Sequence, residues 1–154
     1  MAEAMGFGGV GTWLQSGNLV FEARRRATAG LEEGLENETE KAFGLQVHYM
    51  VRTSDEWAEI IARNPFPDAA KDDPGHLLVL ALKRAPTKQD VAALRAAIKG
   101  RETLEAVGRE VYVIYADGIG TSRLTNAVIE KTLGTRATGR NWNTVRKLAE
   151  LMNS

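Results

Sequence analysis

The sequence predicts an α+β fold of two halves, each a split βαβ unit in which a helix connects two strands that have a third strand between them. Three observations lead to this prediction. Short alternating or continuous apolar runs, typical of strands, lie between segments with apolar residues at helical spacing. A proline-rich, charged connection at residues 64–75 divides the chain near its middle. The elements follow a similar order on its two sides, except that the first half lacks an opening strand and helix.

Residues 1–67 make up the first half. Residues 12–22 predict a β-hairpin with Gly17-Asn18 as a two-residue turn, because glycine accepts the positive φ that such a turn requires. Apolar residues at near-helical spacing then predict a helix that stops at Gly44. Residues 46–51 alternate as expected of a strand. The solvated face of the helix is expected to carry Glu32, Glu33, Glu36 and Glu40.

A capping box at Thr53 and Glu56 opens the last helix of the first half. This helix is expected to bury Trp57, Ile60 and Ile61. It ends before Pro65, because proline disfavours helical geometry in the residue that precedes it. The segment Asn64–Asp68 is then predicted to be a rigid loop with Phe66 packed inward.

Residues 68–154 make up the second half. The continuous apolar run Leu77–Leu82 predicts a strand that is buried on both faces and central in its sheet. Thr87 is expected to cap a helix that ends at Gly100.

Two further patterns complete the second half. Residues 103–106 and 110–115 predict a hairpin, and apolar spacing predicts helices near residues 122–133 and 142–152. The predicted order is therefore strand–helix–strand–strand–helix–helix. The two halves form either separate units or one shared compact domain.

The composition excludes several classes of function. The 154 residues contain no cysteine, which removes disulfides, thiolate metal sites and thiol nucleophiles. Two histidines, His48 and His76, are too few for a typical transition-metal site. The longest aliphatic run is too short to span a bilayer and the N-terminus lacks a signal-peptide pattern. The sequence therefore predicts a cytoplasmic protein with no membrane partner.

Positive charge is concentrated towards the C-terminus. Over the whole chain, 20 basic residues balance 20 acidic ones. Residues 119–154 contain six Lys or Arg and two Glu, a local net charge of +4 that leaves −4 for the remainder. This distribution favours the attraction of anionic ligands to the C-terminal part of the chain.

Several motifs in the correct order point to a known family. Residues 12–21, 64–68, 107–113, 117–126 and 140–148 resemble the bacterial family known as domain of unknown function 1697. The likeness extends over nearly the whole chain and implies two ferredoxin-like halves. It implies no activity, cofactor or catalytic residue.

The chain departs from the family pattern at its start. Members usually begin with a strand, a glycine-containing turn and a helix, and residues 1–11 stand in their place here. A start codon assigned too late, an incomplete first half, or a partner chain that fills the gap would each explain this. We favour the late start.

The first candidate site is the segment Asp117–Asn126, where a glycine-containing turn leads into a predicted helix. Helix N-termini carry unpaired N–H groups and the positive end of the dipole, which favours phosphate or carboxylate binding. The structural alternative is an ordinary strand-to-helix turn capped by Thr121 or Ser122, and short glycine motifs favour this alternative. The proposed ligand-binding residues are Gly118, Gly120, Thr121, Ser122, Arg123 and Asn126.

The second candidate site is the start of the last helix. Arg and Asn side chains suit phosphates or base edges, and Trp142 suits base stacking. The structural alternative, which is again favoured, is that Asn141 or Asn143 caps the helix and Trp142 lies in the core. The two candidates would reinforce each other if both opened on one cleft. The proposed ligand-binding residues here are Arg140, Asn141, Asn143, Arg146 and Lys147.

A third, weaker candidate is formed by Gln15, Ser16 and Asn18, for which ordinary turn chemistry is the favoured explanation. No catalytic residue, metal ligand or cofactor is predicted, and the oligomeric state is unknown.

Three functions remain open from the sequence. The first is a binding module for an anionic ligand, such as a nucleotide, a phosphorylated metabolite or a nucleic-acid phosphate. The second is an enzyme that acts on a phosphorylated small molecule in the same place. The third is an assembly protein that pairs with a second copy through exposed sheet edges.

Overall fold

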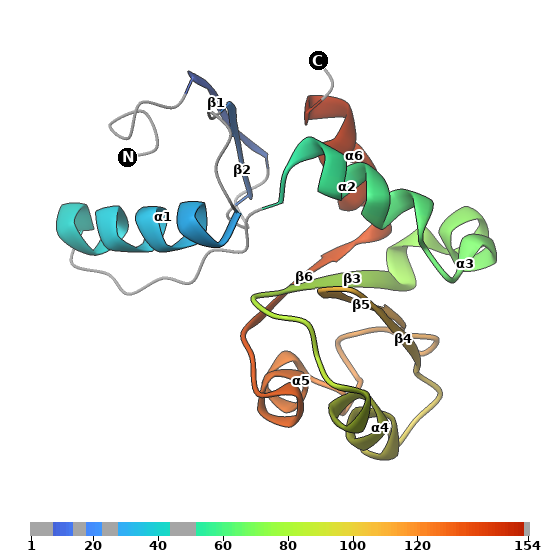
Figure 1. Cartoon of the computed structure of the whole chain (residues 1–154). Coiled ribbons are helices and arrows are strands. Elements are labelled where there is room, and N and C mark those ends of the chain that lie inside the picture. Colours follow the sequence, from blue (N-terminus) through green and yellow to red (C-terminus); the bar gives the residue numbers. More distant parts are fainter. Residues whose placement is uncertain (1–7, 14–17, 23–27, 44–51, 153–154) are drawn as a thin grey trace. The chain divides into compact units, whose positions relative to one another are not determined.

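A computed structural model of the chain describes residues 8–13, 18–22, 28–43 and 52–152 (Figure 1). The chain forms two compact units. Unit 1 contains residues 1–57 and 148–154, and unit 2 contains residues 58–147. The boundary expected between residues 67 and 68 falls within unit 2.

Unit 1 contains a two-stranded antiparallel sheet and a long helix. Strands β1 (Gly8–Trp13) and β2 (Asn18–Glu22) pair with Trp13 opposite Asn18, and α1 covers Thr28–Phe43. The predicted hairpin is confirmed. Its predicted turn at Gly17-Asn18 is wrong, because Asn18 lies in β2 and pairs with Trp13 of β1. The residues that connect the strands, 14–17, and the strand predicted over 46–51 lie outside the described residues.

An ion pair is buried in unit 1. Arg52 Nη1 lies 3.6 Å from Glu32 Oε2, and the two side chains are only 2% and 5% exposed. The expectation that Glu32 lies on a solvated helix face is therefore wrong, whereas Glu33 and Glu40 are exposed. Helical spacing did not indicate this burial, because the partner lies 20 residues further along the chain.

Helix α2 (Ser54–Ala62) begins in unit 1 and ends in unit 2. Its predicted capping box is confirmed: Thr53 N donates to Glu56 Oε1 at 2.9 Å, and Glu56 N donates to Thr53 Oγ1 at 3.1 Å. Three of its residues were expected to be buried. Trp57 and Ile60 are buried, while Ile61 is half-buried.

Unit 2 is built on a four-stranded antiparallel sheet. Its elements are α3 (Pro67–Asp72), the short 3-10 helix η2 (Pro74–His76), β3 (Leu77–Leu82), α4 (Lys88–Ala96), β4 (Thr103–Val107), β5 (Glu110–Ile114), α5 (Asn126–Leu133), β6 (Ala137–Asn141) and the start of α6 (Trp142–Met152). The strand order is β4-β5-β3-β6, which makes β3 central as predicted. The predicted α+β class is confirmed, although the sheet described in unit 1 has only two strands.

Strand β6 is an element of unit 2 that the sequence did not predict, as are α3 and η2 in the predicted connection at residues 64–75. Residues Ala137–Asn141 contain no apolar alternation, and they are held as a strand by antiparallel pairing with β3. Gly139 leaves room for the side chain of Leu78, because a Cβ there would lie 2.9 Å from Leu78 Cδ2. The helices predicted near 122–133 and 142–152 are thus separated by a strand.

The two faces of this sheet pack against different elements (Figure 1). Leu80, Leu82, Val111 and Val113 form one core with α4 and α5. Side chains alternate along a strand, so Tyr112 faces the other side. There its hydroxyl donates to the backbone carbonyl of Ile60 at 2.6 Å, and burial raises its pKa. The last turn of α2 is therefore anchored over the face opposite α4 and α5.

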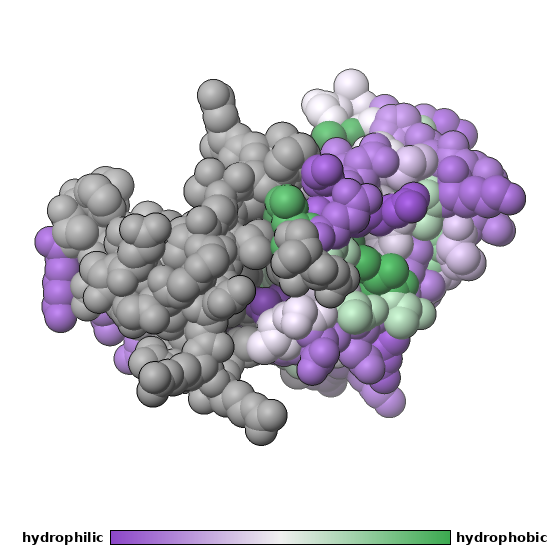
Figure 2. Space-filling model, turned by 90° about the horizontal axis from the view of Figure 1, so that it is seen from above, coloured by the Kyte–Doolittle hydropathy of each residue, from purple (hydrophilic) through white to green (hydrophobic). Residues whose placement is uncertain are grey.

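The described surface in Figure 2 is mainly hydrophilic, with small hydrophobic areas. Of the large hydrophobic side chains that the structure describes, Ile119 is the exposed one, at 56%. No helix in the described ranges has both the length and the apolar character needed to cross a membrane.

Replacing Gly139 by alanine should destabilise the protein by about 1 to 3 kcal/mol, because the added methyl group overpacks the contact with Leu78. Gly120→Ala is the matched control, since a Cβ at Gly120 meets no atom within 4 Å. Both variants lose the flexibility of glycine in the unfolded chain, so their difference isolates the packing cost. Urea unfolding measures it, and equal midpoints would contradict the close packing.

Glu32→Ala should cost about 3 kcal/mol or more of unfolding free energy, because it leaves the guanidinium of Arg52 buried without this carboxylate. Glu33→Ala, on the exposed side of the same helix, should stay within about 0.5 kcal/mol of the parent. Urea unfolding followed by circular dichroism compares the two. A similar effect for both variants would show that the ion pair does not contribute.

Candidate functional site

The segment Asp117–Asn126 connects β5 to α5. Helix α5 begins at Asn126, and its N-cap is Thr125, whose Oγ1 accepts a hydrogen bond from Val128 N at 3.3 Å. The prediction that Thr121 or Ser122 caps this helix is wrong. The helix begins later than the sequence suggested, and the glycine-containing turn precedes its cap.

The polar groups of this turn are engaged within the protein. Ser122 Oγ donates to Glu102 Oε1 at 2.5 Å and accepts from Leu124 N at 3.0 Å. Thr121 Oγ1 donates to the backbone carbonyl of Asp117 at 3.0 Å. The carboxylate of Asp117 pairs with Arg101, with 3.1 Å between Nε and Oδ2. These bonds fasten the turn to the connection between α4 and β4.

Two carboxylates therefore lie at the first candidate site. The hydrogen bond from Ser122 holds the pKa of Glu102 below its usual range, and the hydrogen bond from Arg101 does the same for Asp117. Both groups are charged at neutral pH, and a bound anion would meet their repulsion. Arg123 is exposed and makes no ion pair among the described residues. The contacts support the structural alternative for this turn.

The conformations of the two glycines differ. Gly118 has φ +88°, a value that favours glycine, whereas Gly120 has no positive φ. Asn126 has a structural role, because its Nδ2 donates to the backbone carbonyl of Ala137 at 3.3 Å. Ligand binding by this group of residues stays a prediction.

The second candidate segment spans the end of β6 and the start of α6. Asn141 caps α6, since its Oδ1 accepts from Thr144 N at 3.1 Å. Trp142 is 5% exposed. Both observations agree with the structural alternative given by the sequence. Arg140 lies in β6, where its Nη1 donates to the carbonyl of Gly139 at 2.7 Å and burial lowers its pKa.

The remaining residues of this segment differ in exposure. Asn143 and Arg146 are exposed, whereas Lys147 is half-buried and has a partner. Asn18 of the third candidate lies in β2, and Gln15 and Ser16 lie outside the described residues.

The two main candidate segments lie on opposite faces of the sheet. Leu124 belongs to the core with α4 and α5. It is held there by Tyr115, whose hydroxyl donates to its backbone carbonyl at 2.9 Å and whose pKa burial raises to about 12. Trp142 and Arg146 instead line a pocket together with Ile61, on the face that Tyr112 contacts. The expected single cleft is not formed.

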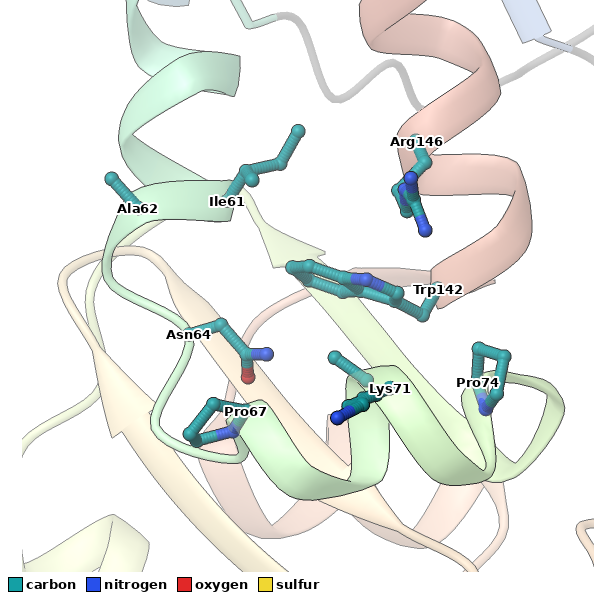
Figure 3. Close-up of a pocket in the computed structure, with 9 residues that line it drawn as sticks. Ile61, Ala62, Asn64, Pro67, Lys71, Pro74, Trp142 and Arg146 are labelled. Carbon is teal, nitrogen blue, oxygen red and sulfur yellow. The ribbon is translucent and has the colours of Figure 1, made fainter.

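This pocket, called the α3–α6 pocket here, has a volume of about 490 Å³. Figure 3 shows the indole of Trp142 at its centre, with Arg146 on one side and Asn64 and Lys71 on the other. The lining residues are Ile61, Ala62, Asn64, Pro67, Ala70, Lys71, Pro74, Trp142 and Arg146, all within unit 2. Of the residues that the sequence proposed as ligand-binding, Arg146 alone is among them.

The shape of the pocket depends on a turn closed by Asn64. Its Oδ1 accepts from Phe66 N at 3.0 Å, and its Nδ2 donates to the Phe66 carbonyl at 3.2 Å. Pro67 then starts α3, a position where its missing N–H costs nothing. The loop predicted over Asn64–Asp68 is confirmed only as far as Phe66, because Pro67 and Asp68 lie in α3, and Phe66 is half-buried rather than fully packed inward.

The charged side chains in the lining of the α3–α6 pocket are both positive. Lys71 and Arg146 are exposed, and neither makes an ion pair or hydrogen bond within the described part of the chain. The nine lining residues include no Asp or Glu. The sequence did not reveal this site, because Asn64 and Lys71 lie 82 and 75 residues before Arg146.

Other chemistry is sparse around this pocket. Asp73 Oδ2 lies 2.8 Å from His76 Nδ1 in an exposed pair beside η2, outside the pocket lining. In the described residues, no group of three His, Asp or Glu side chains is placed to hold a metal ion.

Comparison with known proteins yields a family and a fold. The family model for a protein of unknown function, DUF1697, matches residues 1–112. The match ends within β5 and leaves out both main candidate segments. No curated protein matches the chain.

Among solved structures, the chain is similar to the conserved bacterial protein SP0830 from Streptococcus pneumoniae. The TM-score is 0.72 at 15% identity, and the likeness covers 99% of this chain and 85% of that one. At this identity it shows the fold alone.

Because of the carboxylates at the Asp117 turn, the stability of the protein should change with pH in the acidic range. Its carboxylate and that of Glu102 have lowered pKa values when folded, so they stabilise the fold above the usual carboxyl pKa of about 4. This contribution is lost as the pH falls through the lowered values. Asp117→Asn should therefore lower Tm at pH 7 and have little effect near pH 2. A Tm difference that is the same at both pH values would contradict this account.

Proposed function

We propose that this chain, which belongs to the DUF1697 family of proteins of unknown function, binds an anionic small organic molecule in the α3–α6 pocket. The observation that carries the proposal is the pairing of two unpartnered cations, Lys71 and Arg146, in a lining without carboxylates. Its volume of about 490 Å³ falls in the range of small-molecule sites.

The side chains present suit an organic anion. Arginine offers a planar fork of donors that matches a carboxylate or phosphate, and lysine offers a compact positive charge. One of the two hydrogens on Asn64 Nδ2 is used by the Phe66 carbonyl, so the other is available for a ligand. The apolar residues of the lining provide contacts for a carbon skeleton.

This proposal keeps the binding function expected from the sequence and changes its location. Two carboxylates lie at the turn formed by Gly118–Arg123, whereas the lining of the α3–α6 pocket contains none. Arg146 is the one predicted residue that both versions share. A nucleotide or another phosphorylated metabolite remains compatible with this chemistry.

We also infer that unit 2 is one ferredoxin-like half. The element order β3-α4-β4-β5-α5-β6 and the strand order β4-β5-β3-β6 support this inference. It places α2, α3 and the start of α6 outside that half, as additions that cover the second face of the sheet and form the pocket.

Calorimetry with phenyl phosphate at low salt tests the binding function. The double variant Lys71→Gln/Arg146→Gln should weaken binding about fivefold to tenfold, a loss of about 1 to 1.4 kcal/mol, because it removes both positive charges of the lining. Affinity should also fall as salt rises.

Arg123→Gln is the matched control. It removes an equally exposed, unpartnered arginine at the Asp117 turn, and it should leave the affinity unchanged. If Arg123→Gln abolishes binding while the double variant Lys71→Gln/Arg146→Gln has no effect, the site is the turn and the proposed pocket is wrong.

A further inference from the structure

We infer, resting on the proposed function, that the ligand of the α3–α6 pocket is elongated and carries an anionic group at each end of an apolar body. The pocket holds its two cations on different elements, Lys71 on α3 and Arg146 on α6. Figure 3 shows these side chains on opposite sides of the Trp142 indole. Their arrangement therefore matches two separated negative charges better than one compact anion.

Most of the lining is apolar. The indole of Trp142 lies between the two cations (Figure 3), and the other apolar lining residues are Ile61, Ala62, Pro67, Ala70 and Pro74. Hydrocarbon gains from leaving water for such a surface, whereas a hydrated inorganic anion does not. A ligand with a carbon body between its charges would satisfy both the centre and the ends of the pocket.

A rigid lining supports discrimination by the pocket between ligands of different length. Pro67 and Pro74 have fixed φ, the turn at Asn64 is closed by two hydrogen bonds, and Trp142 is buried with 5% of its surface exposed. The backbone positions of Lys71 and Arg146 are thus set by structured elements. A ligand that is too short would reach only one cation at a time, and the second interaction would be lost.

Matched carboxylates test this inference. Calorimetry compares α,ω-dicarboxylates of four to ten carbons with monocarboxylates of the same carbon number, on the full chain. At one or two chain lengths the dicarboxylate should bind at least tenfold more tightly than its monocarboxylate, because the second charge adds an intramolecular contact.

Variants test whether Lys71 and Arg146 each bind one end of the ligand. Lys71→Gln and Arg146→Gln should each reduce the best dicarboxylate to the affinity of its monocarboxylate, and Arg123→Gln should leave the tenfold preference intact. Circular dichroism confirms that the variants are folded, which both exposed positions should permit.

The outcomes separate this inference from the proposed function. If monocarboxylates and phenyl phosphate bind through Arg146 or Lys71 but no dicarboxylate binds more tightly, the pocket binds a single anion and the two-ended ligand is wrong. If neither phenyl phosphate nor any carboxylate binds, the proposed function fails and this inference fails with it.

Discussion

The central position of β3 is the constraint on which the arrangement of unit 2 depends. Its six residues are apolar on both faces, and it pairs with β5 on one side and β6 on the other. A strand of this kind is stable only when both faces of its sheet are covered. Helices α4 and α5 cover one face, and the other face meets Ile60 through Tyr112. The α3–α6 pocket exists because this second face is covered by short elements that leave space between them.

Several local signals in the sequence predicted the structure correctly. The capping box at Thr53, the N-cap at Thr87, the apolar run of β3 and the hairpin of β4 and β5 each depend on residues within a few positions of one another. Strand β6 depends instead on pairing with a distant strand and on the absence of a side chain at Gly139. Nothing in its own five residues marks it as a strand.

The same distinction explains the functional site. Glycine at a turn and asparagine at a helix start suggested ligand contacts. In the structure, however, Ser122 donates a hydrogen bond to Glu102, and Asn141 accepts one from the backbone of α6. Lys71 gave no signal, because a single lysine in a charged connection is unremarkable until folding brings it near Trp142 and Arg146. Sequence reasoning pointed to Arg146 of this pocket but not to Lys71, which lies on the other side of the Trp142 indole.

Side chains near β6 also form hydrogen bonds with the backbone of this strand. The backbone carbonyl of Ala137 accepts from Asn126, its N–H donates to Glu130 Oε2 at 2.9 Å, and the carbonyl of Gly139 accepts from Arg140. An incoming strand would have to break these bonds before it could pair with β6. Extension of the sheet by backbone pairing at this border would therefore have to displace side chains that already occupy the backbone of Ala137 and Gly139.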